Sequence, residues 1–181
     1  MTTSMVTIAG GTFENVASKV EEKHRGFCEF NDFDYTMHRD IISNGLPWSW
    51  SKLPAILDEF EKGYERVIWC DADCLPIADK FELPDLPIQV SIDYNGYCCG
   101  FMVLNREAIP FIEMWHMLGP LKHNDNKWEQ STFKHLSKFK SVSDMIFPIP
   151  ETIVANPRTK GVDNPLFYHQ WLGGDGSKWS A

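Results

Sequence analysis

Apolar runs and helically spaced segments alternate along most of the chain. Short apolar or β-branched runs bounded by glycine or proline are typical of strands, and apolar residues three and four positions apart are typical of helices. The expected strands are Val6–Ala9, one within Cys28–Met37, Val67–Cys70, Ile88–Ile92, Gly100–Leu104 and Met145–Ile149. The expected helices are Phe13–His24, Lys52–Lys62, Arg106–Leu118 and Lys127–Phe139. This alternation predicts an α/β fold with a mixed sheet.

Individual residues mark the expected helix ends. Gly63 follows the second helix and is expected to end it, and Asn105 precedes the third, where its side chain is expected to cap the first turn. Trp115 is expected to point from the third helix into the core. Prolines interrupt the segment Asp79–Pro87 and the chain after Pro150, so both are expected to be loops.

The strand Val67–Cys70 leads directly into two carboxylates, Asp71 and Asp73, which are separated by one residue. The carboxyl ends of strands in open α/β sheets are where ligands bind. In an extended chain, residues two apart point the same way, so both carboxylates are expected to reach one centre. Two like charges so close repel each other unless a cation lies between them, and hard divalent cations prefer oxygen ligands. The pattern therefore predicts a metal site at a strand end.

Three interpretations of Asp71-Ala72-Asp73 stay open on the motif alone. The two acids can be solvated residues of a turn. An apolar strand followed by Asp-x-Asp is also typical of phosphohydrolases of the haloacid-dehalogenase type. Those proteins carry the motif near the N-terminus and have Thr or Val two residues after the second Asp, where this chain has Leu75. The third interpretation is a nucleotide-sugar glycosyltransferase, in which a divalent cation bridges the carboxylates and the donor diphosphate.

The 181 residues carry a net charge of -8, which argues against nucleic acid or an anionic membrane as a partner. A phosphorylated ligand would then need a cation or a few well-placed lysines. The five cysteines form no Cys-x-x-Cys pair and are expected to be small buried thiols in a reducing compartment. The sequence shows neither a basic leader before an apolar core nor a run of about eighteen apolar residues. We therefore expect a soluble, cytoplasmic protein without a transmembrane segment.

Five motifs occur in an order that resembles one group of enzymes. They are Trp50-Ser51-Lys52-Leu53-Pro54, Val67-Ile68-Trp69-Cys70-Asp71-Ala72-Asp73, Cys99-Gly100-Phe101-Met102-Val103-Leu104-Asn105, Trp128-Glu129-Gln130 and His169. The chain resembles glycosyltransferases of the GT-A fold, and most closely glycosyltransferase family 34, the retaining galactosyl- and xylosyltransferases. The resemblance implies one compact domain over residues 1–181 with a mixed, mostly parallel sheet. The nucleotide-binding half would be 1–75, and the donor-sugar and acceptor half, with a C-terminal metal and diphosphate loop, would be 76–181.

The same resemblance implies a role for each site residue. Asp71, Asp73 and His169 would bind a divalent ion, Mn²⁺ or Mg²⁺. Glu129 and Gln130 would be the catalytic pair, with the acid on sugar hydroxyls and the amide beside the reacting anomeric carbon. The turn after the first strand adds glycines that would let the backbone approach a nucleotide. The residues expected to bind the donor are Ala9, Gly10, Gly11, Thr12, Lys52, Asp71, Ala72, Asp73, Asp93, Asn95, Gly100, Gly173, Gly174 and Lys178.

The activity that this resemblance implies is metal-dependent, retaining transfer of a hexose or pentose from a UDP-sugar to a hydroxyl of a glycan or another acceptor. Two further alternatives stay open. One is an inverting enzyme of the same fold with Asp93 or Glu129 as the base, and the other is a non-catalytic module that binds a nucleotide sugar. A histidine must be neutral to bind a metal, so if His169 is a ligand, metal affinity is expected to weaken below about pH 6.5.

Overall fold

A six-stranded sheet in the order β2-β1-β3-β6-β5-β7 lies at the centre of the computed structural model. The structure describes residues 1–10, 13–40, 42, 45–122 and 129–170. The strands are β1 (Thr3–Ile8), β2 (Asp34–His38), β3 (Arg66–Cys70), β5 (Ile88–Asp93), β6 (Gly96–Asn105) and β7 (Ile146–Ile149). Strand β1 pairs in parallel with β2 and β3, β5 pairs in parallel with β7, and β6 runs antiparallel between the two groups. The predicted α/β fold with a mixed sheet is therefore confirmed.

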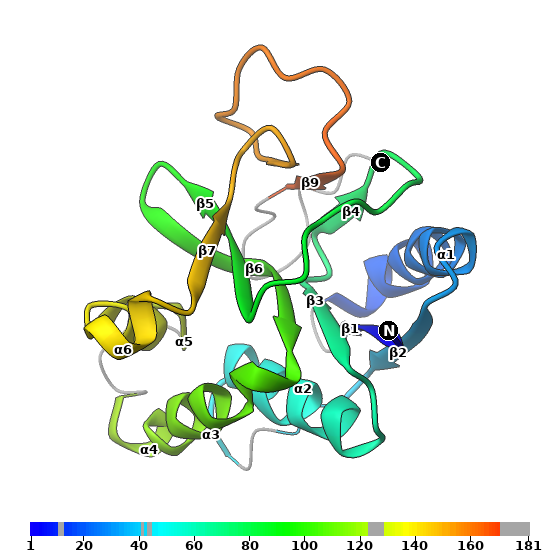
Figure 1. Ribbon diagram of the computed structural model, residues 1–181. Coiled ribbons are helices and arrows are strands. Elements are labelled where there is room, and N and C mark those ends of the chain that lie inside the picture. The colour runs from blue at the N-terminus through cyan, green and yellow to red at the C-terminus, as the bar shows by residue number, and fades with distance from the viewer. Residues whose placement is uncertain (11–12, 41, 43–44, 123–128, 171–181) are drawn as a thin grey trace.

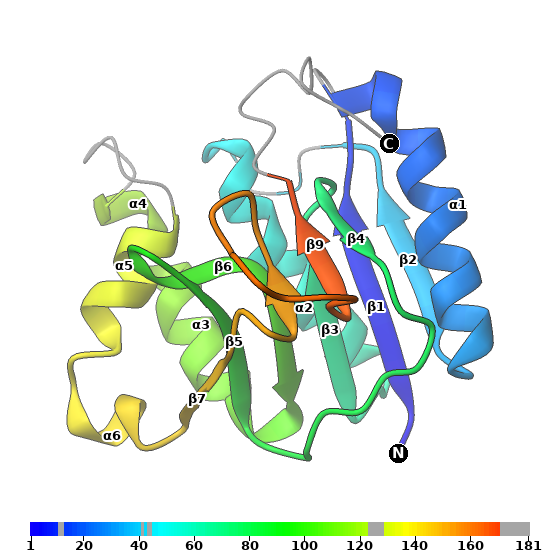
Figure 2. The same ribbon diagram turned by 90° about the horizontal axis from the view of Figure 1, so that it is seen from above.

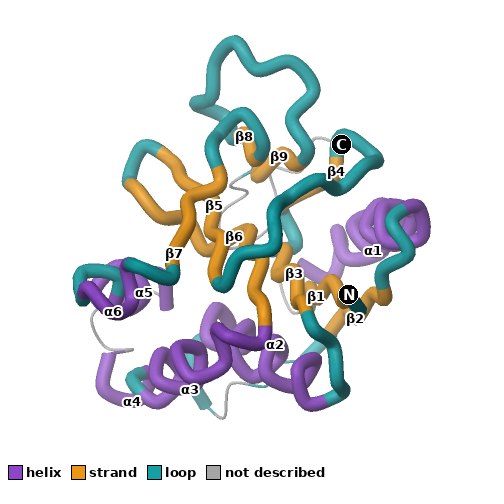
Figure 3. The backbone as a smooth tube through the Cα atoms, in the orientation of Figure 1, coloured by secondary structure: helices purple, strands orange, loops and turns teal. Residues whose placement is uncertain are grey.

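Helices cover both faces of this sheet (Figure 1 and Figure 3). On one face lie α2 (Lys52–Glu61), α3 (Ile109–Met117) and α5 (Glu129–Leu136), with the short helices α4 (Gly119–Lys122) and α6 (Lys140–Ser143) near them. On the other face lie α1 (Glu14–Phe30) and a second sheet in the order β4-β9-β8, formed by β4 (Cys74–Pro76), β8 (Val154–Ala155) and β9 (Phe167–His169) (Figure 2). Among the described residues, no helix is both long enough and apolar enough to cross a membrane.

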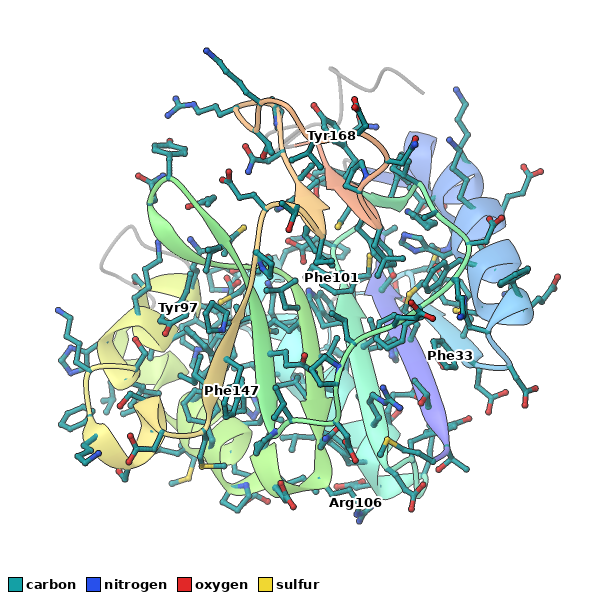
Figure 4. All side chains as sticks on the ribbon, turned by 45° about the horizontal axis from the view of Figure 1, so that its top comes forward. Phe33, Tyr97, Phe101, Arg106, Phe147 and Tyr168 are labelled. Atoms are coloured by element: carbon teal, nitrogen blue, oxygen red, sulfur yellow. The ribbon has the colours of Figure 1, made fainter. Side chains whose placement is uncertain are left out.

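Two apolar layers follow from the alternation of side chains along β3. Val67 and Trp69 pack toward α2 and α3 in one buried cluster. Ile68 packs in the other, toward α1 and the second sheet. In this second layer Phe101, labelled in Figure 4, lies with its ring centroid 4.4 Å from that of Phe167 on β9. Because both faces of β3 are covered, its residues Val67–Cys70 form a continuous apolar run rather than an alternating pattern.

Helix α1 continues to Phe30, beyond the predicted end at His24. His24, Phe27 and Cys28 are all buried, so the helical spacing of buried positions goes on past the point where the prediction stopped. The expected strand within Cys28–Met37 consequently starts only at Asp34.

Other element ends agree with the sequence in part. Gly63 has a φ of +104° and ends α2, and Trp115 is fully buried, both as predicted. Asn105 makes no capping hydrogen bond; it is the last residue of β6, its amide donates to Asp85, and a 3-10 turn, η3 (Arg106–Ala108), precedes α3. The chain after Pro150 was expected to be loop but contains β8 and β9, which are too short to leave a periodic pattern.

A buried histidine ties α1 to the second sheet. His24 Nε2 donates to the Cys74 carbonyl oxygen over 2.8 Å, and its Nδ1 lies 3.1 Å from Thr7 Oγ1. Burial lowers the pKa of His24 to about 4, because an imidazolium ion there would lose its water, and the hydrogen bond to Cys74 opposes the shift only in part. His24 is therefore a neutral, structural residue at physiological pH.

Acid is expected to destabilise the fold through His24. The unfolded chain binds a proton at this side chain near pH 6.5, and the folded chain only near pH 4, so its stabilising effect is complete above pH 6.5 and is lost as the pH falls. In urea unfolding, the free energy of unfolding should fall by about 2–3 kcal/mol between pH 7.5 and pH 4.5 because of His24 alone. The His24→Gln variant should lack that part of the decrease. An identical decrease in both proteins would contradict the assignment.

Candidate metal and donor site

Asp71 and Asp73 lie in a turn directly after β3. The Cys74 N–H donates to the Asp71 carbonyl oxygen over 2.9 Å, which closes the turn. The Asp71 N–H donates to the Gly100 carbonyl oxygen over 2.8 Å, which fixes the turn against β6. The sequence predicted that an extended chain would point both carboxylates at one centre. This geometry was wrong, because the turn, which reverses the chain, brings the two carboxylates together instead.

His169 joins the two carboxylates from strand β9. Because β9 pairs antiparallel with β4, His169 lies opposite Cys74, the residue that closes the turn. His169 Nε2 lies 3.1 Å from Asp73 Oδ1. One ligand atom from each of Asp71, Asp73 and His169 lies within 4.8 Å of the others. The three residues predicted as metal ligands are thus brought together at the carboxyl end of β3.

A bulge in β6 lies beside this group. Val90 pairs with Met102, whereas the next residue of β5, Ser91, pairs with Cys98. Residues 99–101 of β6 are therefore extra relative to β5. Such bulges bend a strand and redirect its side chains, and they are common next to active sites. Here the bulge separates the hairpin end of β6 from Met102–Leu104, which pair with both β3 and β5.

Gly100, within the bulge, makes room for the ring of His169. A Cβ atom at position 100 would lie 2.2 Å from His169 Cε1 and 2.8 Å from each ring nitrogen. No side chain fits there unless the histidine moves. Gly100 was expected to approach the donor, and that contact stays a prediction; in the structure, the space beside its Cα is filled by the imidazole of His169.

A buried lysine connects Asp71 to the start of α5. Lys52, the first residue of α2, is 3% exposed, and its Nζ lies 2.6 Å from Glu129 Oε1 and 3.4 Å from Asp71 Oδ1. It also donates to the Cys99 carbonyl oxygen over 2.9 Å. The indole N–H of Trp69 also donates a hydrogen bond to Asp71 Oδ1, over 2.6 Å. The Lys52 ammonium thus has protein acceptors and orients the carboxylates of Asp71 and Glu129, and its contact with the nucleotide-sugar donor stays a prediction.

The site holds more negative than positive charge. Lys52 Nζ lies within 3.4 Å of carboxylate oxygens of Asp71 and Glu129, and Asp73 adds a third carboxylate beside His169. Burial raises the pKa of Asp71, and although Lys52 opposes this shift, the neighbouring carboxylates support it. Burial disfavours a charge on His169 as well, but the hydrogen bonds to Asp73 and Cys98 and the nearby negative charge of Asp73 together outweigh burial, so the pKa of His169 lies well above its ordinary value. A proton on this ring compensates negative charge that a divalent ion would otherwise balance. Competition between proton and metal is therefore expected to begin above the pH of about 6.5 inferred from the sequence.

Helix α5 begins with Glu129 and Gln130. Glu129 is 3% exposed, and its Oε2 has no hydrogen-bond partner among the described residues. The same holds for Thr132 Oγ1, one turn further along the helix. Gln130 Oε1 accepts a hydrogen bond from the Cys99 N–H over 3.0 Å. The two residues predicted to be catalytic are thus fixed to the same point of β6, Glu129 through Lys52 and Gln130 directly.

Asp93 and Asn95 lie at the turn of the β5–β6 hairpin. Asp93 Oδ1 accepts from the Asn95 N–H over 2.6 Å, and the Asn95 carbonyl oxygen accepts from Lys134 Nζ over 3.0 Å. Within the described part of the chain, neither residue belongs to the group of ligand atoms around Asp71. Their contact with a donor sugar stays a prediction.

The end of β1 lies beside the metal-site turn. Ala9 and Ala72, both expected to line the donor site, belong to one small apolar cluster. Gly10 approaches the backbone of the protein itself, because a Cβ atom there would lie 1.9 Å from the Arg39 carbonyl oxygen. The other residues predicted to bind the donor lie outside the described residues: Gly11, Thr12, Gly173, Gly174 and Lys178.

Two residues of the site were not predicted from the sequence. Trp69 stands two positions before Asp71, and residues two apart in a strand lie on the same face, so this contact could have been predicted from the spacing. Cys98 Sγ lies 3.5 Å from His169 Nδ1. This second contact depends on where β9 lies, and no local spacing indicates it.

A second group of possible metal ligands occurs between β2 and α2. His38, Asp58 and Glu59 have ligand atoms within 4.8 Å of one another. Lys62 Nζ lies 2.7 Å from Asp58 Oδ2 and 2.7 Å from Glu59 Oε1. Because the lysine already supplies the positive charge between these carboxylates, we assign no metal site there.

Comparison with known proteins places the fold. No family model and no curated protein matches the chain. A solved glycosyltransferase involved in the glycosylation of the major capsid of PBCV-1 matches with a TM-score of 0.80 and 13% identity, covering 97% of this chain and 96% of that one. The apo form of the glycosyltransferase GlyE from Streptococcus pneumoniae TIGR4 matches with a TM-score of 0.63 and 10% identity, covering 93% of this chain and 54% of that one.

A second GlyE structure matches with a TM-score of 0.60 and 12% identity, covering 92% of this chain and 54% of that one. The chain thus spans about half the length of GlyE. The resemblance to family 34 stays a prediction. The single α/β domain, with helices on both sides of a mixed sheet, is the GT-A-like fold of these glycosyltransferases.

Proposed function

We propose that the protein is a metal-dependent glycosyltransferase that moves a sugar from a nucleotide-sugar donor to an acceptor hydroxyl. The observation that carries the proposal is the group formed by Asp71, Asp73 and His169, whose ligand atoms lie within 4.8 Å of one another. The group lies at the carboxyl end of a strand, where open α/β sheets bind their ligands. The fold shared with solved glycosyltransferases supports this interpretation.

The donor atoms of this group suit Mn²⁺, and Mg²⁺ as a second choice, because two carboxylates and one imidazole match the preferences of such ions. A bound ion would act as a Lewis acid that neutralises the diphosphate of the leaving nucleotide. Lys52 and Trp69 hold Asp71 in place through its Oδ1 atom. Because the chain carries a net charge of -8, a negatively charged diphosphate needs the local positive charge of a bound metal ion in order to bind.

The start of α5 is the proposed site of the donor sugar. Glu129 Oε2 and Thr132 Oγ1 are buried and lack hydrogen-bond partners among the described residues, and buried polar atoms of this kind normally have one. Sugar hydroxyls would satisfy both atoms. Gln130 is anchored to β6 by its side-chain oxygen, which fixes its amide beside Glu129. We propose a hexose or pentose carried by UDP as the donor and, from the resemblance to family 34, transfer with retention of configuration.

Thermal unfolding with Mn²⁺, with UDP and with both together tests the proposal. A ligand at about 100 times its dissociation constant adds about 2.7 kcal/mol to the free energy of unfolding. For a domain of this size the midpoint should rise by about 5–10 °C. The full rise is expected only when both ligands are present, because the metal bridges protein and diphosphate. Equal unfolding midpoints in these three conditions and in the ligand-free protein would overturn the proposal.

Turnover separates an enzyme from a binding module. Release of UDP from a panel of UDP-sugars, measured with Mn²⁺ and then with EDTA, should show metal-dependent hydrolysis or transfer. Metal-dependent binding without release of UDP above background would indicate a module that binds the nucleotide without turnover. The anomeric configuration of the product, read by NMR, then decides between retention and inversion.

A further inference from the structure

The ring of His169 lies between two side-chain partners, in space left by a glycine. Cys98 Sγ lies 3.5 Å from Nδ1, and Nε2 lies 3.1 Å from Asp73 Oδ1. The absence of a side chain at Gly100 leaves space for the ring between these partners. Cys98 is 6% exposed, so its thiol is protected from bulk water. One nitrogen of the ring therefore faces a sulfur atom and the other faces the carboxylate group of the site.

This orientation matters because an imidazole binds a metal through a nitrogen that carries no proton. A neutral ring keeps one N–H, and the hydrogen-bond acceptor of that N–H decides which nitrogen stays available. Nε2 is the nitrogen beside Asp73, so Nδ1 must keep the proton if Nε2 is to bind the ion. A cysteine sulfur is a weak acceptor, and the one at Cys98 lies within reach of Nδ1.

We propose that Cys98 is a positioning residue of the metal site: its sulfur accepts the Nδ1–H of His169 and thereby fixes the tautomer that offers Nε2 to the divalent ion. The inference rests on the proposed function. Cys98 touches neither donor nor acceptor in this scheme and acts only through His169. The spacing along β6 gives the arrangement its physical basis, because Cys98 and Gly100 are two positions apart and therefore both face the same ring.

Calorimetric titration of Mn²⁺ in the presence of UDP gives the first test. Loss of a partner that orients a metal-binding histidine weakens metal affinity about 10- to 100-fold. Because a thiol is a weak acceptor, Cys98→Ala should weaken Mn²⁺ binding by about tenfold, the lower end of that range. Cys98→Ser retains an acceptor oxygen and should restore most of the affinity. The matched control is Cys28→Ala, which truncates another buried thiol, in α1, and should bind Mn²⁺ like the wild type.

The ring tautomer gives a second test that a packing role would not affect. Nitrogen-15 NMR of the Mg²⁺–UDP complex should show His169 with a protonated Nδ1 and an unprotonated Nε2 in the wild type. Cys98→Ala should reduce the population of that form, whereas Cys98→Ser should keep it. An unchanged tautomer and unchanged affinity in Cys98→Ala would overturn the inference.

The two proposals fail in different ways. Wild-type protein that binds no Mn²⁺ with UDP would overturn the proposed function and this inference together. Wild-type binding that is lost in His169→Ala but fully retained in Cys98→Ala would overturn this inference alone. Binding weakened in Cys98→Ala and restored in Cys98→Ser supports both.

Discussion

Replacing Asp73 with asparagine is expected to lower the rate of sugar transfer by at least about a thousandfold, which corresponds to about 4 kcal/mol of transition-state stabilisation. Asparagine keeps the shape of the side chain and an oxygen that can still accept from His169 Nε2, which lies 3.1 Å from Asp73 Oδ1. The fold should therefore persist. The lost negative charge removes one of the two carboxylates that would hold the ion, so Mn²⁺-dependent binding of UDP should disappear as well.

Two measurements check this expectation: UDP release with a UDP-sugar that the wild type turns over, and calorimetric binding of UDP with Mn²⁺. Asp79→Asn is the matched control. Asp79 is an exposed residue after β4, so the substitution makes the same chemical change outside the site. The control should behave like the wild type. Asp73→Asn protein that still binds UDP only in the presence of Mn²⁺, with turnover within about tenfold of the wild type, would remove Asp73 from the metal site.

The Lys52→Met variant is expected to lose about 3–5 kcal/mol of stability, because removing one partner of a buried ion pair leaves the other charge uncompensated. Lys52 is 3% exposed and lies 2.6 Å from Glu129 Oε1, and it also faces Asp71. Without the ammonium, the Glu129 carboxylate loses its ion pair, and because it is buried, solvent water does not replace that partner. Methionine fills a similar volume, so lost packing contributes little to the expected effect.

A double-mutant cycle separates charge from packing here. The Lys52→Met, Glu129→Gln double variant removes both charges and should recover most of the lost free energy of unfolding in urea, but not the activity. Lys140→Met is the control for loss of a lysine, since Lys140 is 88% exposed and its surface ion pair should contribute nothing measurable. Single and double variants whose effects simply add would show that Lys52 and Glu129 do not stabilise each other.

Much of the chain's local structure was predictable from its sequence. The apolar run Val67–Cys70 has no polar position because both faces of β3 are covered, so it identified a central strand without any knowledge of its neighbours. Gly63 marked the end of α2 because a glycine readily adopts the positive φ found there. The position of Asp71 and Asp73 at the end of this strand was predictable as well, because both residues directly follow the apolar run in the sequence.

The sequence by itself determined the α/β class and the position of two carboxylates at the end of a central strand, since both depend on residues close together in the chain. Only the tertiary structure decided that Lys52 is buried against Glu129 and that Cys98 contacts His169. Burial and contact of this kind depend on strand register, on the bulge in β6 and on the pairing of β9 with β4. Register and pairing arise from packing between distant segments, and the spacing of residues within one segment does not specify them.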